Sequence, residues 1–393
     1  MNHPISQIAT LLLGSVLAVS AWSESSPTAA DDAAHFAPPE SSILFWNSEQ
    51  KIAGFRNIDA LFPTRTITAS EAPLSLPTSL QDLGGVEIEH GDVRMTVDEY
   101  FDQAKVAGLL VIKDGVIVYE RYGLGNNAQS RWISFSVSKS VVSMLIGAAI
   151  EDGYIKNVDE MAVDYLPRLK DSSYAEVTIG NLLQMSSGVE WNEDYADPKS
   201  DIATVEWATL SLYEQLRHKP RKAAPGEIFN YNSAETNLAG TLLRSAIGNN
   251  LSTYLTEKIW QPFGMADDAS WQLTEPGGGE FGGCCINATL QDYGRLGLFA
   301  MNNGVTPAGT RILPAGWMAQ STKPSKGADY YGYFWWLKPD GSYDASGIFG
   351  QGIHVNAAEK VVIALHSARD EADGGFELQD ALYNALVEAL STR

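Results

Sequence analysis

Apolar and polar positions predict strands at both ends of the chain. Near the start, apolar runs at 108–112 and 116–119 flank Asp114-Gly115, a dipeptide typical of a tight hairpin turn. Near the end, apolar runs at 348–355 and 360–365 flank a polar turn. Because strands that are distant in sequence can pair within one sheet, we predict an antiparallel sheet assembled from both ends of the chain.

The segment between these strands shows mainly helical periodicity, with apolar residues three and four positions apart. The helical candidates are 136–152, 179–183, 235–246, 290–301 and, after the last strand, 377–390. The fold class is therefore predicted to be α+β, with a helical region inserted between the two groups of strands.

The length of 393 residues and a hydrophobic content of 45% allow one large domain or two interleaved ones. We expect one domain over 41–393, with a strand-bearing part at about 100–150 and 330–393 and a helical insert at about 151–329. Residues 40–100 lack strong periodicity and are expected to wrap over the main body as loops and short elements.

The N-terminus predicts export to the periplasm or out of the cell. An apolar run from Ile8 to Val19, followed by the small residue Ala21, is typical of a signal peptide over 1–21. The run is too short to span a bilayer, so no membrane span is expected after cleavage. Residues 22–40, rich in Ser, Ala, Asp and Pro, are expected to form a disordered tether.

Charge and cysteine content exclude several function classes. The 27 Lys and Arg against 48 Asp and Glu give a net charge of −21, which argues against nucleic acid or anionic membrane as a partner. Cys284 and Cys285 are adjacent, and two buried thiols are favoured over a vicinal disulfide. The six histidines form no metal-binding pattern and Gly277-Gly278-Gly279 lacks the lysine of a phosphate loop, so neither a metal nor another cofactor is predicted.

The candidate chemistry lies at the start of the helix predicted near residue 136. Ser136 and Lys139 are three residues apart, which places a hydroxyl and an amine on one helical face beside the N–H groups of the helix N-terminus. Ser48 and Lys51 have the same spacing without an apolar helix behind them, so spacing alone is weak evidence. Tyr231, in a turn before another predicted helix, would complete a Ser/Lys/Tyr set.

Several further segments, in their order and spacing along the chain, together resemble the serine β-lactamase and penicillin-binding-protein superfamily. The resemblance is to its class C β-lactamase-like esterase and amidase branch, and within that to the 6-aminohexanoate-dimer hydrolases. It covers roughly residues 100–390 and, weakly, 43–66. The segments are Ser136-Val137-Ser138-Lys139, Leu182-Leu183-Gln184-Met185-Ser186-Ser187-Gly188, Pro225-Gly226 with Tyr231, Pro262-Phe263-Gly264-Met265, Asn287-Ala288-Thr289 with Asp292-Tyr293-Gly294-Arg295, and Tyr331-Gly332-Tyr333-Phe334-Trp335-Trp336.

The resemblance implies a three-layer α/β/α fold and an acyl-enzyme mechanism. Ser136 would attack an ester or amide carbonyl, with Lys139 and Tyr231 sharing the roles of general base and acid. The oxyanion would be bound by the N–H groups of Ser136 and of Ile348, which follows Gly347.

Two departures from the family pattern narrow the expected substrate. The third motif corresponds to Ala345-Ser346-Gly347 and lacks the cation that binds a β-lactam carboxylate. The second motif, usually Tyr-x-Asn, has Ser233 at its third position, so the contact of that asparagine with substrate is not carried over. We therefore expect a serine hydrolase acting on a carboxylic ester or short linear amide, rather than a β-lactamase or D-alanyl-D-alanine carboxypeptidase.

The loop after residue 188 is expected to contact the leaving group. Tyr195 resembles a tyrosine that the 6-aminohexanoate-dimer hydrolases place near the leaving amine, and Trp191 lies in the same loop. Glu193 and its acidic neighbours Glu190, Asp194 and Asp197 could bind an ammonium group, although a solvated acidic loop is favoured. A noncatalytic binding domain on this fold is a remaining alternative, which loss of Lys139 or Tyr231 would have favoured; the oligomeric state is left open.

Overall fold

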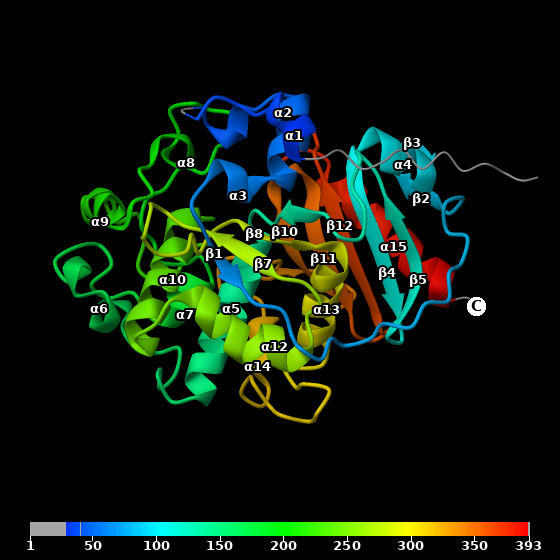
Figure 1. Cartoon of the computed structure of the whole chain (residues 1–393). Coiled ribbons are helices and arrows are strands. Elements are labelled where there is room, and N and C mark those ends of the chain that lie inside the picture. The colour runs from blue at the N-terminus through cyan, green and yellow to red at the C-terminus, as the bar shows by residue number, and fades with distance from the viewer. Residues whose placement is uncertain (1–28, 40, 392–393) are drawn as a thin grey trace, which may run out of the picture.

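A six-stranded antiparallel sheet forms the centre of the protein (Figure 1). The structure is a computed structural model that describes residues 29–39 and 41–391. The strand order is β5-β4-β12-β11-β10-β9, so strands from the two ends of the chain pair directly, and the predicted sheet is confirmed. Its strands are β4 (Val106–Lys113), β5 (Val116–Tyr122), β9 (Trp336–Leu337), β10 (Tyr343–Gly347), β11 (Gln351–Asn356) and β12 (Val361–Ser367).

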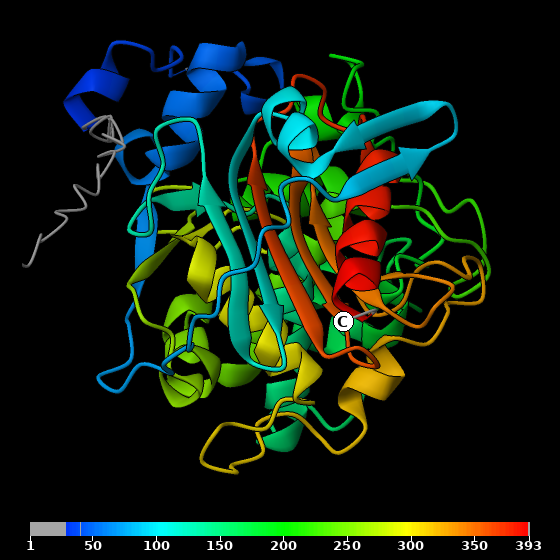
Figure 2. The ribbon, with the colours of Figure 1, turned by 90° about the vertical axis from the view of Figure 1, so that its right-hand side faces the viewer.

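The sheet is buried on both faces, which gives the expected three layers. Side chains alternate along β4, so Leu109 and Val111 pack in one apolar cluster with the C-terminal helix α15, whereas Leu110 and Ile112 pack in another with the inserted helices. Figure 2 shows α15 in front of the sheet and the inserted helices behind it. The continuous burial of β4 explains its unbroken apolar sequence.

Helices fill the layers on both sides of the sheet, and the five predicted from periodicity are confirmed to within two residues at each end. The α-helices are α1 (Ala29–Ala33), α2 (Ser48–Arg56), α3 (Ile58–Leu61), α4 (Val97–Gln103), α5 (Val137–Glu151), α6 (Ala162–Tyr165), α7 (Ile179–Leu183), α8 (Asp201–Thr204), α9 (Thr209–Arg217), α10 (Ser233–Ile247), α11 (Leu251–Leu255), α12 (Gln261–Phe263), α13 (Leu290–Met301), α14 (Trp317–Ser321) and α15 (Phe376–Ser391). The other helical turns are the 3-10 turns η1 (Ile43–Phe45), η2 (Pro167–Leu169) and η4 (Ile348–Gly350) and the π-helical turn η3 (Thr256–Trp260). None of the helices among the described residues is long and apolar enough to cross a membrane.

A second antiparallel sheet was not predicted. Its order is β1-β7-β8-β6, with strands β1 (Thr64–Ile67), β6 (Arg131–Ile133), β7 (Ala269–Gln272) and β8 (Ile286–Thr289). Two of these strands come from the insert, which is therefore less purely helical than its periodicity indicates. The sheet matters for the site because β6 leads directly into α5, and its pairing with β8 fixes where that helix begins. A separate hairpin pairs β2 (Glu87–His90) with β3 (Val93–Thr96).

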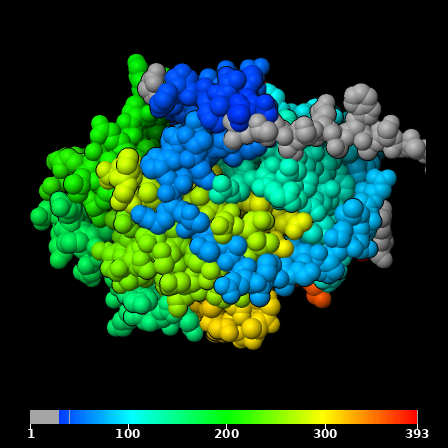
Figure 3. All heavy atoms as spheres, in the orientation of Figure 1, coloured from blue at the N-terminus to red at the C-terminus, as the bar shows by residue number. Residues whose placement is uncertain are grey.

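The N-terminal residues wrap over the main body, as Figure 3 shows for the blue segment that crosses the front of the molecule. The predicted signal peptide lies outside the described residues. Of the predicted tether, the structure describes residues 29–39, in which Asp32 of α1 is 6% exposed and accepts hydrogen bonds from Arg56 and Asn57. A buried carboxylate with two donors holds α1 against α2.

The last hairpin begins later than its apolar run predicts. Ile348 and its two successors form the 3-10 turn η4, in which Phe349 has a φ of 60°, and the strand starts only at Gln351. A left-handed residue cannot continue a strand, so the predicted start at 348 is wrong by three residues. The turn places Ile348 beside the N-terminus of α5, where the candidate chemistry lies.

Candidate active site

Ser136 lies at the N-terminus of α5, immediately after a strained residue. Phe135, between β6 and the helix, has a φ of 43°, and Ser136 then takes helical angles as the capping residue. The Ser136 side chain makes no capping hydrogen bond to its own helix, so its hydroxyl is available to other partners. Left-handed backbone at a non-glycine residue persists only where the surroundings enforce it, and here it aims Ser136 into the site.

Lys139 is fully buried beneath Ser136, as the three-residue spacing predicts. Its ammonium nitrogen, Nζ, donates to Ser136 Oγ at 2.8 Å, to Ser233 Oγ at 2.9 Å and to the Gly283 carbonyl at 2.9 Å. Burial lowers the pKa of Lys139 to about 8, while the nearby Glu193 carboxylate acts in the opposite direction. A neutral amine in contact with the serine hydroxyl is therefore accessible close to neutral pH.

Tyr231 completes the predicted set and lies just before α10. Its ring is 5.2 Å from Lys139 Nζ and stacks at 5.6 Å on Trp336 of β9, which fixes the phenol beside the serine. Burial raises the pKa of Tyr231, Glu193 raises it further, and a hydrogen bond with Ser136 acts in the opposite direction. The phenol therefore keeps its proton at neutral pH, and the structure brings all three predicted residues together.

Glu193 is part of this site, contrary to the expectation of a solvated acidic loop. Its carboxylate accepts hydrogen bonds from the Ser233 hydroxyl and backbone N–H, from the Trp191 indole and from Tyr195 Oη at 2.8 Å. Ser233 thus connects the buried lysine to a carboxylate. Sequence reasoning missed both roles, because an acidic residue in an acidic loop and a serine in place of the family's asparagine carry no signal of their own.

The N-terminal wrap packs against the residues next to Ser136 and Ile348. Phe55 of α2 is fully buried, and its ring centroid lies 5.0 Å from that of Phe135 and 5.6 Å from that of Phe349. The rings of Phe135 and Phe349 are themselves 5.3 Å apart. Both of these residues have positive φ, so Phe55 packs against the two strained positions that flank the candidate oxyanion donors.

Gly347 allows the end of β10 to approach the start of α5. A Cβ at this position would lie 2.5 Å from the Ser134 carbonyl oxygen and 3.1 Å from the Phe135 Cβ. Its φ of −125° is ordinary, so close approach rather than backbone conformation requires glycine here. The next residue, Ile348, lines the same cavities as Ser136, as expected of the second oxyanion donor.

Two cavities meet at Ser136, and both are also lined by Tyr195 and Ile348. The larger, of about 570 Å³, contains Tyr231, Ser346, Gly347 and several charged side chains, namely Glu193, Lys338, Asp373, Glu377 and Asp380. Lys338 is already paired with Asp344 at 3.0 Å and Asp380 at 2.6 Å, so this cavity is anionic overall. The smaller, of about 300 Å³, is lined by residues 41–44 and by residues within 202–207, which do not line the larger one.

Of the two loop residues expected to contact substrate, only Tyr195 faces the cavities. Tyr195 lines both cavities, as expected of a substrate contact, whereas Trp191 is 6% exposed, lines neither and donates to Glu193. Trp191 therefore supports the site rather than facing it. Ala345, the first residue of the expected third motif, is 1% exposed and belongs to the apolar core. Across residues 29–39 and 41–391, no group of three or more His, Cys, Asp or Glu side chains is arranged to hold a metal ion.

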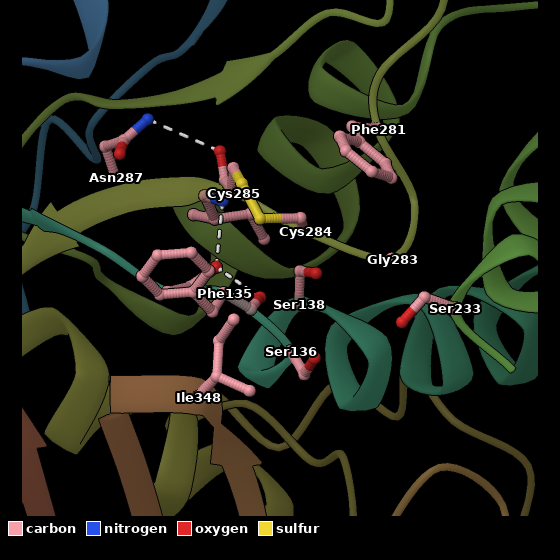
Figure 4. The surroundings of a disulfide bond; sticks show 12 residues. Phe135, Ser136, Ser138, Ser233, Phe281, Gly283, Cys284, Cys285, Asn287 and Ile348 are labelled. Atoms are coloured by element: carbon pink, nitrogen blue, oxygen red, sulfur yellow. Dashed lines mark hydrogen bonds between the residues drawn. A yellow bond between two sulfur atoms is a disulfide. The ribbon is translucent and has the colours of Figure 1, made fainter. Parts of the chain in front are cut away.

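Cys284 and Cys285 form a vicinal disulfide, so the expectation of two free thiols is wrong. The disulfide directly follows Gly283, whose carbonyl accepts from Lys139, and Figure 4 shows it in the same region as Phe135, Ser136 and Ile348. The loop is anchored by the Cys284 carbonyl, which accepts from the Trp271 indole at 2.9 Å. Adjacent cysteines give no spacing signal, because only the local backbone decides whether their sulfurs meet.

The second Ser-x-x-Lys match has no comparable chemistry. Lys51 Nζ donates to the Arg369 and Asp370 carbonyls, each at 2.7 Å, and Ser48 donates to the Asp370 carboxylate at 2.7 Å. Both side chains therefore hold α2 against the segment after β12 through hydrogen bonds. This distinction supports the assignment of the chemistry to Ser136.

Comparison with known families agrees with this geometry. The family model described as Beta-lactamase matches residues 93–387, which is most of the chain. The chain belongs to the Beta-lactamase family. The prediction of a hydrolase of this family is thereby confirmed, and the match does not include Phe55.

Among related proteins, this Beta-lactamase-family chain is similar to the 6-aminohexanoate-dimer hydrolase of Paenarthrobacter ureafaciens. The two are 25% identical over 342 residues, covering 80% of this chain and 85% of the relative. A solved structure from Bacillus anthracis, provisionally assigned as a 6-aminohexanoate-dimer hydrolase, superposes with a TM-score of 0.79 at 22% identity, covering 89% of this chain and 95% of the other. A family VIII carboxylesterase gives 0.56 at 17% identity, with coverage of 73% and 96%. These likenesses confirm the predicted fold.

Proposed function

We propose that this protein is a serine hydrolase that cleaves a carboxylic ester or a short linear amide through an acyl-enzyme on Ser136. The observation that carries the proposal is the set of contacts around Lys139, whose Nζ lies 2.8 Å from the Ser136 hydroxyl in a buried site. A buried lysine with a lowered pKa, hydrogen-bonded to a serine at a helix N-terminus, has the properties of a general base beside its nucleophile.

In the acylation step, neutral Lys139 takes the proton of Ser136 as Oγ forms a bond to the substrate carbonyl carbon. The developing oxyanion is bound by the N–H groups of Ser136 and Ile348. Tyr231, whose phenol remains protonated, donates its proton to the leaving oxygen or nitrogen as the bond to carbon breaks, and it is reprotonated from Lys139. The protons balance, because the one removed from Ser136 replaces the one given up by Tyr231.

In the deacylation step, a water molecule takes the place of the leaving group. Lys139 and Tyr231 act as the base that removes its proton, the acyl carbon gains a bond to oxygen, and Ser136 Oγ recovers a proton as it leaves. The products are a carboxylic acid and a free enzyme. The coupling between Lys139 and Tyr231 means that a pH profile reports the pair.

The choice of ester or linear amide over β-lactam rests on charge. A penicillin carboxylate needs a cation near the third motif, and Ala345 is buried there while the adjoining cavity is anionic. The similarity to the Paenarthrobacter ureafaciens hydrolase favours a linear amide, and the likeness to the carboxylesterase favours an ester. The disulfide at Cys284–Cys285 supports the expectation of an exported protein, since such bonds persist in oxidising compartments.

A substrate panel tests the proposal. Nitrophenyl esters, the linear 6-aminohexanoate dimer and a penicillin are offered to the protein and to Ser136→Ala, with release of acid and intact mass as readouts. We expect turnover of the esters or the amide, abolished in the variant, and no turnover of penicillin. Turnover of penicillin alone would favour a β-lactamase, and no turnover of any probe by the folded protein would favour a noncatalytic domain.

A further inference from the structure

The smaller cavity beside Ser136 differs in character from the larger one. Its lining side chains are mainly apolar, with Ile43, Leu44, Phe62, Ile202, Val205 and Trp207 among them. None of the described residues that line it is charged, whereas five charged residues line the larger cavity. In a substrate bound at Ser136, the acyl chain and the leaving group, on either side of the carbonyl carbon, would therefore meet different surroundings, one apolar and one charged.

Three separate segments build this cavity. Residues 41–44 and Phe62 come from the N-terminal wrap, residues 202–207 come from α8 and the loop after it, and residues 281–285 carry the vicinal disulfide. Trp207 packs on Phe281 with ring centroids 4.3 Å apart, which joins two of the three segments. The disulfide contributes sulfur atoms without thiol protons to the wall, so it adds apolar surface close to the nucleophile.

The position of Tyr231 determines which arm enters which cavity. Tyr231 lines only the larger cavity, and in the proposed mechanism it donates a proton to the leaving group. The leaving group therefore lies in the larger cavity. Since Ser136 and Ile348 line both cavities, a carbonyl carbon bonded to Ser136 Oγ, with its oxygen at Ile348, directs its acyl chain into the smaller one.

We propose that the smaller cavity is an acyl-binding subsite for an uncharged apolar chain. This inference rests on the proposed function and adds a substrate class to it. A cavity of about 300 Å³ with an apolar wall gains affinity from each methylene buried, and it disfavours an ammonium chain end because its described lining holds no carboxylate to neutralise that charge. The subsite therefore favours a plain alkyl acyl chain over one that ends in an ammonium group.

A series of nitrophenyl esters with acetyl, butyryl, hexanoyl and octanoyl chains tests the subsite. We expect kcat/KM to rise by about fourfold for each methylene until the cavity is filled. The matched probe is the 6-aminohexanoyl ester, which has the six carbons of the hexanoyl chain and adds a positive end. We expect it to react at least about tenfold more slowly than hexanoyl, because its ammonium group has to be desolvated.

Two variants and one control connect the preference to the cavity. Ala203→Trp adds bulk to the lining and should shift the preferred chain to a shorter length, whereas Trp207→Ala removes bulk and should shift it to a longer one. Leu210→Trp, an exposed position on α9 outside the cavity, should leave the profile unchanged. The two cavity variants change size in opposite directions, so one that fails to fold leaves the other as a test.

The outcomes separate this inference from the proposed function. If no ester is hydrolysed and Ser136 is not acylated, the proposed function itself is wrong. If esters are hydrolysed with no dependence on chain length, or if 6-aminohexanoyl reacts as fast as hexanoyl, the subsite proposal is overturned and the hydrolase proposal stands. A profile that shifts equally in Leu210→Trp also overturns the subsite.

Discussion

The hydroxyl of Ser233 lies 2.9 Å from the ammonium nitrogen of Lys139 and links it to the Glu193 carboxylate. This arrangement places a negative charge one hydroxyl away from the candidate base. Glu193 opposes the effect of burial on the pKa of Lys139, because an anion nearby favours the protonated amine. The residue that replaces the family's asparagine is therefore a polar link between the base and an acidic loop.

Glu193→Gln is expected to move the pH dependence of activity to lower pH. Lys139 has to be neutral to act as the base, so kcat/KM rises as pH passes upward through its pKa of about 8. Removing the carboxylate charge destabilises the protonated amine and lowers that pKa, so we expect the midpoint to fall by about one pH unit. The measurement is the pH profile of kcat/KM with a nitrophenyl ester.

The control for this variant is Glu190→Gln, which makes the same chemical change in the same loop. Glu190 pairs with Lys222 at the surface and lies outside both cavities, so its profile should match that of the unmodified protein. A midpoint that rises in Glu193→Gln, or one that shifts equally in both variants, would contradict the role given to Glu193.

Gly347→Ala is expected to reduce kcat by about 10²-fold, a loss typical of removing one oxyanion donor. The added methyl would lie 2.5 Å from the Ser134 carbonyl oxygen, so the end of β10 has to move away from α5 and take Ile348 with it. Steady-state kinetics should show the loss mainly in kcat. Gly85→Ala, where an added methyl contacts nothing within 4 Å, is the control, and unchanged kcat in Gly347→Ala would remove Ile348 from the oxyanion site.

Phe55→Ala is expected to affect both stability and activity. Truncating a fully buried phenylalanine costs about 3–5 kcal/mol of unfolding free energy, and here it also removes the ring packed on Phe135 and Phe349. Phe299→Ala is a matched loss of a buried ring in α13, away from the cavities. Urea unfolding should show similar losses for both, while kcat of the folded protein falls only for Phe55→Ala; equal kcat values would show that Phe55 acts in stability alone.

Glu235→Gln is expected to remove a pH dependence of stability. Burial raises the pKa of Glu235 in α10 to about 8, although Ser187 and Tyr174 donate to its carboxylate. Between its ordinary pKa and about 8, the folded protein holds a proton that the unfolded chain releases, so stability falls as pH rises, by about 1.4 kcal/mol per pH unit. Below pH 4.5 this contribution is fully present.

The measurement for this variant is the difference in unfolding free energy from the unmodified protein at pH 5, 6.5 and 8. Glu235→Gln should gain relative stability as pH rises, whereas Glu257→Gln, an exposed position in η3, should show no trend. A difference that stays constant, or one in which the variant loses relative stability as pH rises, would contradict the raised pKa of Glu235.

The strands of the main sheet and the four longest helices, α5, α10, α13 and α15, could be predicted because each has a clear apolar pattern within its own segment. In the hairpin around Asp114-Gly115 and the helix over Leu290–Met301, most of the apolar residues that form the pattern are buried in the structure. The second sheet could not be predicted, because β6 and β8 have only three and four residues and are too short to show a strand pattern. The late start of β11 depends on the left-handed Phe349, a conformation that an aromatic residue does not signal.

The candidate site was predictable only where residue type and spacing carry chemistry. Ser136, Lys139 and Tyr231 stand out for that reason, and the structure places them together. Glu193 and Phe55 act through contacts with residues from other parts of the chain, so their letters alone gave no indication of a role. The disulfide could not be predicted from the sequence either, because its formation depends on the backbone conformation of one turn.

The most direct test of the central claim is covalent labelling with a fluorophosphonate, followed by intact mass and peptide mapping. We predict one adduct per chain, located on Ser136, absent in Ser136→Ala and retained in Ser48→Ala, whose serine shares the Ser-x-x-Lys spacing but contacts Asp370. An adduct on any other residue, or none on the folded protein, would contradict the assignment of Ser136 as the nucleophile.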